Sequence, residues 1–220
     1  MTPLTIRIVS DVICPWCFVG KRRLEKALLT LSGNVEPSIA WSPFELNPEM
    51  PEAGMSRRTY RSAKFGTWEK SQEMDAQLAA VGASVGIQFN FRKIQRTPNT
   101  FAAHRLIWFA GKQGKQDEIV ERLFQRYFID GEDIGERETL VAIADACGIA
   151  EAATRIFLES GDASAEVKRQ SSLTRESGIS GVPTFILNDI HAVSGAQHED
   201  VLASALRRAA EAPLVSPSST

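Results

Sequence analysis

The spacing of apolar residues changes twice within the first 41 positions of the chain. Residues 4–10 alternate apolar and polar side chains, which is the pattern of a strand. From 15 to 31 the apolar residues recur at helical spacing, and Gly33-Asn34 is a pair that ends helices. Residues 35–41 again favour a strand. The order strand, helix, strand predicts a βαβ unit at the start of the chain.

Helical patterns dominate the middle of the chain, from about 57 to 175. They follow a loop at 42–56 whose three prolines make it unsuited to a helix interior. Pro98 suits the first turn of one of these helices, because its fixed φ and missing N–H are tolerated there. The expected helices cover 67–82, 97–114, 116–131, 136–148, 151–160 and 163–177.

Strand signals return near the end of the chain. Residues 181–189 and 191–195 predict two short strands around a turn at Asn188-Asp189, and a last helix is expected over 199–212. We therefore predict an α/β fold in which a helical insertion interrupts a small sheet unit. The predicted sheet unit is 1–48 and 178–213, the insertion is 57–177, and a flexible tail is 214–220.

Composition excludes several functions without changing this picture. The 220 residues carry a net charge of -2 with both signs interspersed, so the basic surface of a nucleic-acid-binding protein is not expected. No stretch approaches the ~20 apolar residues of a membrane helix. The opening residues, MTPLTIRIVSD, lack the basic and long apolar regions of a secretory signal. We therefore expect a cytoplasmic protein with neither nucleic-acid nor membrane partners.

Two of the three cysteines lie in the tetrapeptide Cys-Pro-Trp-Cys at the predicted strand-to-helix junction. The free N–H groups and positive dipole of a helix N-terminus stabilise a thiolate, and only a thiolate attacks a disulfide. Pro15 suits the first helical position. This spacing predicts that Cys14 attacks a substrate disulfide and that Cys17, one helical turn later, releases the mixed disulfide.

Two other interpretations of this pair are open, namely ordinary buried cysteines and half of a zinc site. A zinc site needs further ligands. Cys147 stands alone in an apolar helical pattern that favours a core position. The histidines, which are not paired at ligand spacing, are His104, His191 and His198. We therefore expect no metal site.

Several segments of the chain resemble one known family. SDVICPWCFVGKRRLE and GISGVPTFILND are similar to the DsbA-like branch of the thioredoxin superfamily. PFELNPEMP, RTPNTFAAHRLI and VSGAQ resemble its cytoplasmic FrnE-type subgroup, so the resemblance extends over nearly the whole chain. It implies a thioredoxin fold interrupted by a helical insertion domain. It also implies a thiol–disulfide oxidoreductase or isomerase that reduces or reshuffles disulfides.

The resemblance implies roles for the residues around the dithiol. The proline opposite the cysteines is cis in that family, and Pro183 occupies this position here. The backbone of Val182 then pairs with an extended substrate chain, while Pro15 and Trp16 contact the substrate beside the sulfurs. Disulfide-containing proteins or small molecules are the expected substrates, and a cellular thiol reductant is the expected partner. No cofactor is required beyond the redox-active Cys14–Cys17 disulfide.

Three further features have structural interpretations beside functional ones. Asp11, three positions before Cys14, is expected to cap the helix or to relay a proton to Cys17. His104 lies in an aromatic-rich helical segment and is expected to be structural. The basic run at 21–26 is expected to be a solvated helix face.

The same resemblance leaves a second function open. Glutathione-dependent isomerases of the 2-hydroxychromene-2-carboxylate type and kappa-class glutathione transferases share the fold, bind glutathione and do not cycle a dithiol. That class usually has serine where this chain has Cys14, which favours redox chemistry. Glutathione is then expected only as a recycling reductant. A non-catalytic binding or chaperone domain on the same fold is a third alternative.

Overall fold

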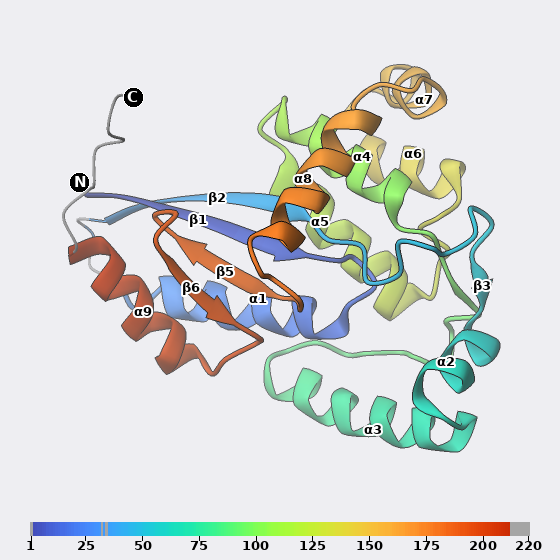
Figure 1. Ribbon diagram of the computed structural model, residues 1–220, viewed down its shortest axis with the longest axis horizontal. Helices are drawn as coiled ribbons and strands as arrows, with labels where there is room; N and C mark the ends of the chain where they lie inside the picture. The colour runs from blue at the N-terminus through green and yellow to red at the C-terminus, as the bar shows by residue number, and fades with distance from the viewer. Residues whose placement is uncertain (1, 32, 34, 212–220) are drawn as a thin grey trace.

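A four-stranded mixed sheet forms the centre of the molecule (Figure 1). The structure is a computed structural model, and it describes residues 2–31, 33 and 35–211. The strand order is β2-β1-β5-β6, in which β1 and β2 are parallel and the other neighbours antiparallel. The first and last parts of the chain therefore build one sheet, as predicted. Its strands are β1 (Thr2–Ser10), β2 (Val35–Pro43), β5 (Thr184–Leu187) and β6 (His191–Ser194).

Strand β1 sends its side chains to two buried clusters. Ile6 and Ile8 belong to the main cluster, together with Phe185, which pairs with Ile8 in the register of β1 and β5. Val9 and Ile186 belong to a separate, smaller cluster. Since successive side chains of a strand point to opposite faces, both faces of the sheet contribute to buried packing. The alternation seen in 4–10 is therefore only partial, because β1 is buried over its last three residues.

Helix α1 (Pro15–Leu28) follows β1 and packs against the last helix, α9 (Glu199–Glu211), as Figure 1 shows. Helix α9 also contacts β1 and β6. The segments β1, α1 and β2 form the predicted βαβ unit, and β5, β6 and α9 complete it. The dithiol motif thus enters the fold at the end of a central strand, where α1 begins.

Helix α1 is shorter than its apolar spacing predicted. It ends at Leu28, and the Thr30 hydroxyl donates a hydrogen bond of 2.7 Å to the Ala27 carbonyl. This bond satisfies a carbonyl of the last turn. The helix therefore ends before Gly33, where the sequence predicted its end. Three other predicted features lie outside the described residues, and they are Asn34, Ala212 and the tail 214–220.

Helices fill nearly all of the chain between β2 and β5. Two short strands, β3 and β4, pair with each other near the start of this region. In the part of the chain that the structure describes, no helix is both long and apolar enough to cross a membrane. The elements are β3 (Met55–Ser56), α2 (Arg57–Phe65), α3 (Trp68–Ser84), β4 (Arg96–Thr97), α4 (Phe101–Gly111), α5 (Gln116–Gln125), η1 (Arg126–Asp130), α6 (Arg137–Ala146), α7 (Glu151–Glu159) and α8 (Ser164–Glu176).

Two of these helices depart from the predicted pattern. Pro98 precedes α4 and does not occupy its first turn, because Thr97 is still paired with Met55 in the β3–β4 ladder. The segment predicted as one helix over 116–131 is α-helical only as far as α5. It continues as the π-helical turn η1, which buries both Tyr127 and Phe128. A π turn holds more residues than an α turn, which allows neighbouring aromatic side chains to face inward together.

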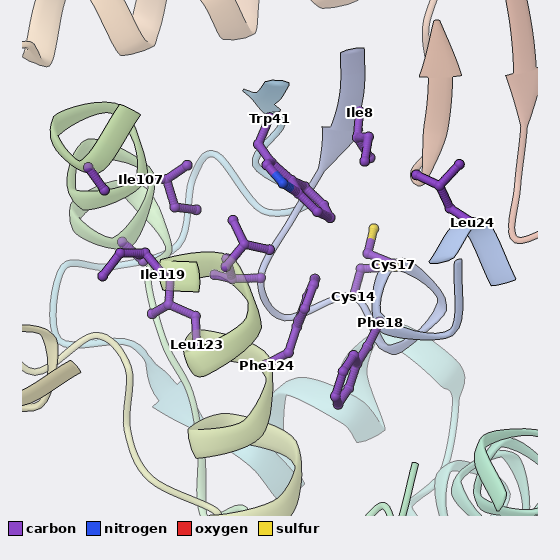
Figure 2. Packing of buried hydrophobic residues seen from close by; sticks show 14 of the residues in the cluster. Ile8, Cys14, Cys17, Phe18, Leu24, Trp41, Ile107, Ile119, Leu123 and Phe124 are labelled. Carbon is purple, nitrogen blue, oxygen red and sulfur yellow. The ribbon is translucent and has the colours of Figure 1, made fainter. Parts of the chain in front are cut away.

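An aromatic cluster joins α1 to the helical region (Figure 2). The Phe18 ring stacks on Phe124 with centroids 5.0 Å apart, and Trp41 of β2 meets Phe124 edge-on at 6.3 Å. Phe128 stacks against Phe18 at 6.3 Å. These contacts belong to the main buried cluster, which therefore runs from the sheet into the helices. The division into separate domains stays a prediction.

The basic run at 21–26 is expected from sequence to be a solvated helix face, and this expectation is wrong for Lys21. Lys21 is 4% exposed, and its Nζ lies 2.5 Å from Glu25, 3.2 Å from Asp117 and 3.2 Å from Glu121. Burial acts to lower the pKa of Lys21, but the three carboxylates outweigh it and the pKa is raised. Arg22 pairs with the same Glu121. Lys21 is buried because α5 supplies two of the carboxylates that pair with it in the interior.

Gly20 marks a close approach between α1 and the segment that enters β5. A Cβ atom at this position would lie 2.9 Å from Pro183 Cγ and 3.1 Å from Phe185 Cζ. We predict that Gly20→Val overpacks this contact and lowers the free energy of unfolding by about 2 kcal/mol. Gly161→Val is the control, because nothing lies within 4 Å of a Cβ there. Urea unfolding measures both, and equal stabilities would contradict the close contact.

Candidate active site

Cys14 occupies the N-cap position of α1, with extended backbone angles of φ -91° and ψ 110°. Its N–H donates to the Asp11 carbonyl at 3.0 Å, and its own carbonyl accepts from the Cys17 N–H at 3.0 Å. Pro15 is the first residue of the helix. Both cysteines are free thiols. The two cysteines are therefore one helical turn apart, and Cys14 directly precedes the first turn of α1, whose N–H groups lack intrahelical partners.

The segment before β5 lies across this helix terminus. Cys14 Sγ lies 3.7 Å from the Val182 carbonyl, to which the thiol donates a hydrogen bond. The Val182–Pro183 peptide bond is cis, and Pro183 is buried. Cys14 is only 5% exposed, whereas Trp16 is 42% exposed. Residues from the two ends of the chain thus meet at the sulfur of Cys14.

Cys17 is 1% exposed. Burial raises the pKa of Cys17 well above its ordinary value, and the hydrogen bond with Cys14 and the charge of Cys14 raise it further. The Ser10 hydroxyl and the Asp11 backbone act in the opposite direction, with smaller effect. The raised pKa keeps Cys17 protonated near neutral pH. Because only a thiolate attacks a disulfide, a nearby group has to take its proton before Cys17 can react.

Asp11 has no solvent exposure. Its Oδ2 accepts a hydrogen bond of 2.7 Å from the Leu46 N–H. Its Oδ1 lies 3.4 Å from His104 Nε2. Among the described residues the Asp11 carboxylate accepts a hydrogen bond from Leu46 and none from the first turn of α1, so the expected capping role gains no support. The donor to this carboxylate is instead the Leu46 N–H, which belongs to the loop after β2.

Unpaired polar atoms gather around Asp11. Ser10 Oγ, Asp11 Oδ1 and His104 Nε2 are buried and have no hydrogen-bond partner among the described residues. The 3.4 Å approach between Asp11 and His104 is thus an ion-pair distance without hydrogen-bond geometry. His104 is expected from sequence to be structural, and its position beside the Asp11 carboxylate was not predicted. A buried carboxylate and a buried imidazole are thus neighbours beside the turn that leads from β1 into α1.

A cleft of about 540 Å³ opens in front of Cys14. Cys14, Trp16 and Val182 lie on one side of it, and α2 and α3 supply the other. The lining is largely apolar, with polar groups concentrated on α2. A volume between about 300 and 1,000 Å³ is usual for small-molecule sites. The polar lining residues that the sequence analysis missed are Arg57, Tyr60, Arg61 and Lys64, and their helical spacing was the available signal.

Cys147 is separate from this arrangement. It follows α6, is 5% exposed and does not line the cleft, so its predicted core position is confirmed. Burial raises the pKa of Cys147, while Arg122 acts in the opposite direction. Within residues 2–31, 33 and 35–211, no group of three or more histidine, cysteine or acidic side chains is arranged to hold a metal ion.

Known proteins are similar to this chain in sequence and in structure. The chain is 31% identical to the protein YwbO of Bacillus subtilis over 203 residues, which cover 91% of this chain and 94% of YwbO. The crystal structure of the probable DsbA oxidoreductase SCO1869 from Streptomyces coelicolor superposes with a TM-score of 0.88 at 30% identity. That match covers 97% of this chain and 93% of SCO1869.

A more distant structure shares the fold alone. The cytosolic disulfide reductase DsbM from Pseudomonas aeruginosa superposes with a TM-score of 0.64 at 17% identity, covering 93% of this chain and 97% of DsbM. The family model for the DSBA-like thioredoxin domain matches residues 5–207, which include the dithiol, the helical region and Pro183. The chain therefore belongs to the DSBA-like thioredoxin domain family.

Proposed function

We propose that this protein is a thiol–disulfide oxidoreductase that reduces or reshuffles disulfides with the Cys14–Cys17 dithiol. One observation carries the proposal. Two free thiols lie one helical turn apart at the N-terminus of α1, and the first of them lines a cleft large enough for a substrate. Membership in a family of disulfide oxidoreductases and isomerases supports the same chemistry.

The proposed cycle uses each thiol once. The Cys14 thiolate attacks one sulfur of a substrate disulfide, forms a mixed disulfide and releases the other sulfur as a thiolate. The Cys17 thiolate then attacks Cys14 Sγ, and the second substrate sulfur leaves. The substrate has gained two electrons, and the protein holds a Cys14–Cys17 disulfide. A cellular thiol reductant, with glutathione as a candidate, restores the dithiol by two exchange steps of the same kind.

Three neighbours of Cys14 are proposed to contact the substrate. The Val182 carbonyl already accepts a hydrogen bond from Cys14, so an extended substrate bound along Val182 would bring its sulfur to Cys14. Pro183 has no N–H and thus adds no competing donor next to the sulfurs. Trp16, which is 42% exposed, offers its ring beside the attacking thiol. Pro15 completes this side of the cleft.

Asp11 is proposed as the group that takes the proton from Cys17. Cys17 needs such a group, because burial raises its pKa. Asp11 directly follows Ser10 in the turn that leads from β1 into α1, and His104 Nε2 lies 3.4 Å from Asp11 Oδ1. The His104 imidazole is the next polar group on this path, because its Nε2 is near Asp11 Oδ1 and has no hydrogen-bond partner among the described residues. Asp11 and His104 therefore act together as a proton relay.

The glutathione-dependent isomerase alternative is less well supported. A chain of that class has no need of a second thiol, whereas this chain has a second free thiol, Cys17, one helical turn after Cys14. A cytoplasmic location rests on the resemblance to the FrnE-type subgroup, and both the location and the subgroup stay predictions. In a reducing compartment the proposed direction is reduction or reshuffling.

The first test labels the thiols of the reduced Cys147→Ala protein. With a limiting amount of iodoacetamide near neutral pH, Cys14 should be alkylated first, because Cys17 is buried with a raised pKa. Cys17→Ser should then accumulate mixed disulfides with substrates, while Cys14→Ser should form none. Mass spectrometry of tryptic peptides reads both results. Preferential labelling of Cys17, or trapping by Cys14→Ser, would reverse the assignment.

The second test concerns the relay. Asp11→Asn retains an oxygen for the Leu46 N–H but cannot take a proton, so release of the mixed disulfide should slow at least tenfold near neutral pH. The defect should shrink as pH rises, since hydroxide then deprotonates Cys17 directly. Asp145→Asn, at an exposed position of α6, is the matched control. Stopped-flow measurement of the second thiol released gives the rates, and an unchanged pH profile would count against the relay.

The third test concerns redox potential. Trp16 carries no charge, so the Cys14 thiolate depends mainly on the helix terminus. We expect a potential between about -270 mV, as in thioredoxin, and about -120 mV, as in DsbA. Trp16→His adds a positive charge near the sulfur, stabilises the reduced form and should make the pair more oxidising. Equilibration in glutathione buffers measures the potential, and no change on Trp16→His would contradict this account.

A further inference from the structure

The cleft in front of Cys14 contains more positive than negative charge. Arg57, Arg61 and Lys64 line it, and Asp75 is its single carboxylate among the lining residues described. Arg57 and Arg61 both bind that carboxylate, each at 2.8 Å through a different oxygen. Asp75 is therefore already shared between two guanidinium groups, and Lys64 has no acidic partner within the described part of the chain.

The same wall has more hydrogen-bond donors than acceptors. Arg57 is 5% exposed, and its Nε has no acceptor among the described residues. Asn47, which does not line the cleft, accepts at Oδ1 from both Tyr60 Oη and Lys64 Nζ, at 2.8 and 3.0 Å. Arg61 also donates to the hydroxyl and the carbonyl of Ser71. The unpaired donor is buried, so a ligand in the cleft would meet the exposed Lys64 ammonium first, and an anion that accepts from this ammonium suits the wall.

The charges repel one another in the absence of such a ligand. Burial lowers the pKa of Arg61, and although Asp75 opposes this, the charge of Arg57 lowers it further. An anion bound between α2 and the dithiol would relieve that repulsion. The group with this chemistry that also fits a donor-rich wall is a carboxylate, which accepts from several donors at once.

The rest of the cleft sets the size and character of the ligand. Apolar side chains supply most of its surface, and its volume is about 540 Å³. Sites of this size bind small organic molecules. The apolar lining residues are Ile13, Leu46, Phe65, Met74, Leu78, Val81 and Val182. A ligand that fits would have an apolar body, a carboxylate directed at α2 and a sulfur directed at Cys14.

We propose that the cleft binds low-molecular-weight disulfides that carry a carboxylate, and that Arg61 and Lys64 hold the carboxylate while Cys14 attacks the sulfur. This inference rests on the proposed oxidoreductase function and names the substrate class for it. The Cys14 thiolate bonds to one sulfur of the ligand, and the other sulfur leaves as a thiolate with the electron pair of the broken bond. Cys17 then displaces the retained half, so one disulfide yields two small thiolates and the protein disulfide.

Two aromatic disulfides test the proposal. Dithiobis(nitrobenzoate) carries carboxylates, and dithiodipyridine does not; both release a coloured thiolate when a protein thiol attacks them. In the Cys147→Ala protein, we expect the rate with the anionic disulfide to saturate with concentration, as binding requires. Lys64→Glu and Arg61→Gln should lower the ratio of anionic to neutral rates by about tenfold. Because both disulfides meet the same Cys14, this ratio cancels any change in the thiol itself.

Lys70→Glu is the matched control, since Lys70 is exposed on α3, outside the cleft lining, and the charge change is the same as in Lys64→Glu. It should leave the ratio unchanged. An unaltered ratio in both cleft variants, or a strictly linear concentration dependence with the anionic disulfide, would overturn the proposal while leaving the oxidoreductase function intact. If neither disulfide reacted with Cys14 of the folded protein, the proposed function itself would fail.

Discussion

The geometry around the dithiol depends on a carboxylate that is fully removed from solvent. Such a group is costly unless polar partners face it, and the partners of Asp11 come from two separate segments. The Leu46 N–H belongs to the loop after β2, and His104 belongs to α4. One side chain thereby ties the end of β1 to both. The turn that presents Cys14 follows within three residues, so its position is determined by the same attachment.

Two opposite kinds of contact hold the first half of helix α1. Near its start, Phe18 stacks among aromatic rings of α5 and η1. One turn further on, Lys21 enters a group of three carboxylates, two of which lie on α5. The helical region therefore does more than cover the sheet. It anchors the dithiol helix, supplies His104 behind the turn and builds the cationic wall of the cleft in front of it.

Local patterns predicted those features that depend on neighbours in sequence. The strand signals of β1, β5 and β6 and the Cys-Pro-Trp-Cys junction are of this kind, because periodicity and turn chemistry act over a few residues. Lys21 was misjudged because its burial depends on carboxylates of α5, which the pattern of α1 does not reveal. The same reason explains why the proximity of Asp11 to His104 and the charged wall on α2 were missed, since each requires distant segments to meet.

The π turn η1 gives two functions to one short stretch of chain. Tyr127 lines the cleft, while its neighbour Phe128 stacks beneath the dithiol helix. In an ordinary α-helix adjacent residues point about 100° apart, and the wider π turn brings these two rings closer together around the helix axis. Loss of a single residue here would restore regular winding and change the angle between the two rings. A change in the length of this turn would therefore alter the lining of the cleft and the packing of the interior at the same time.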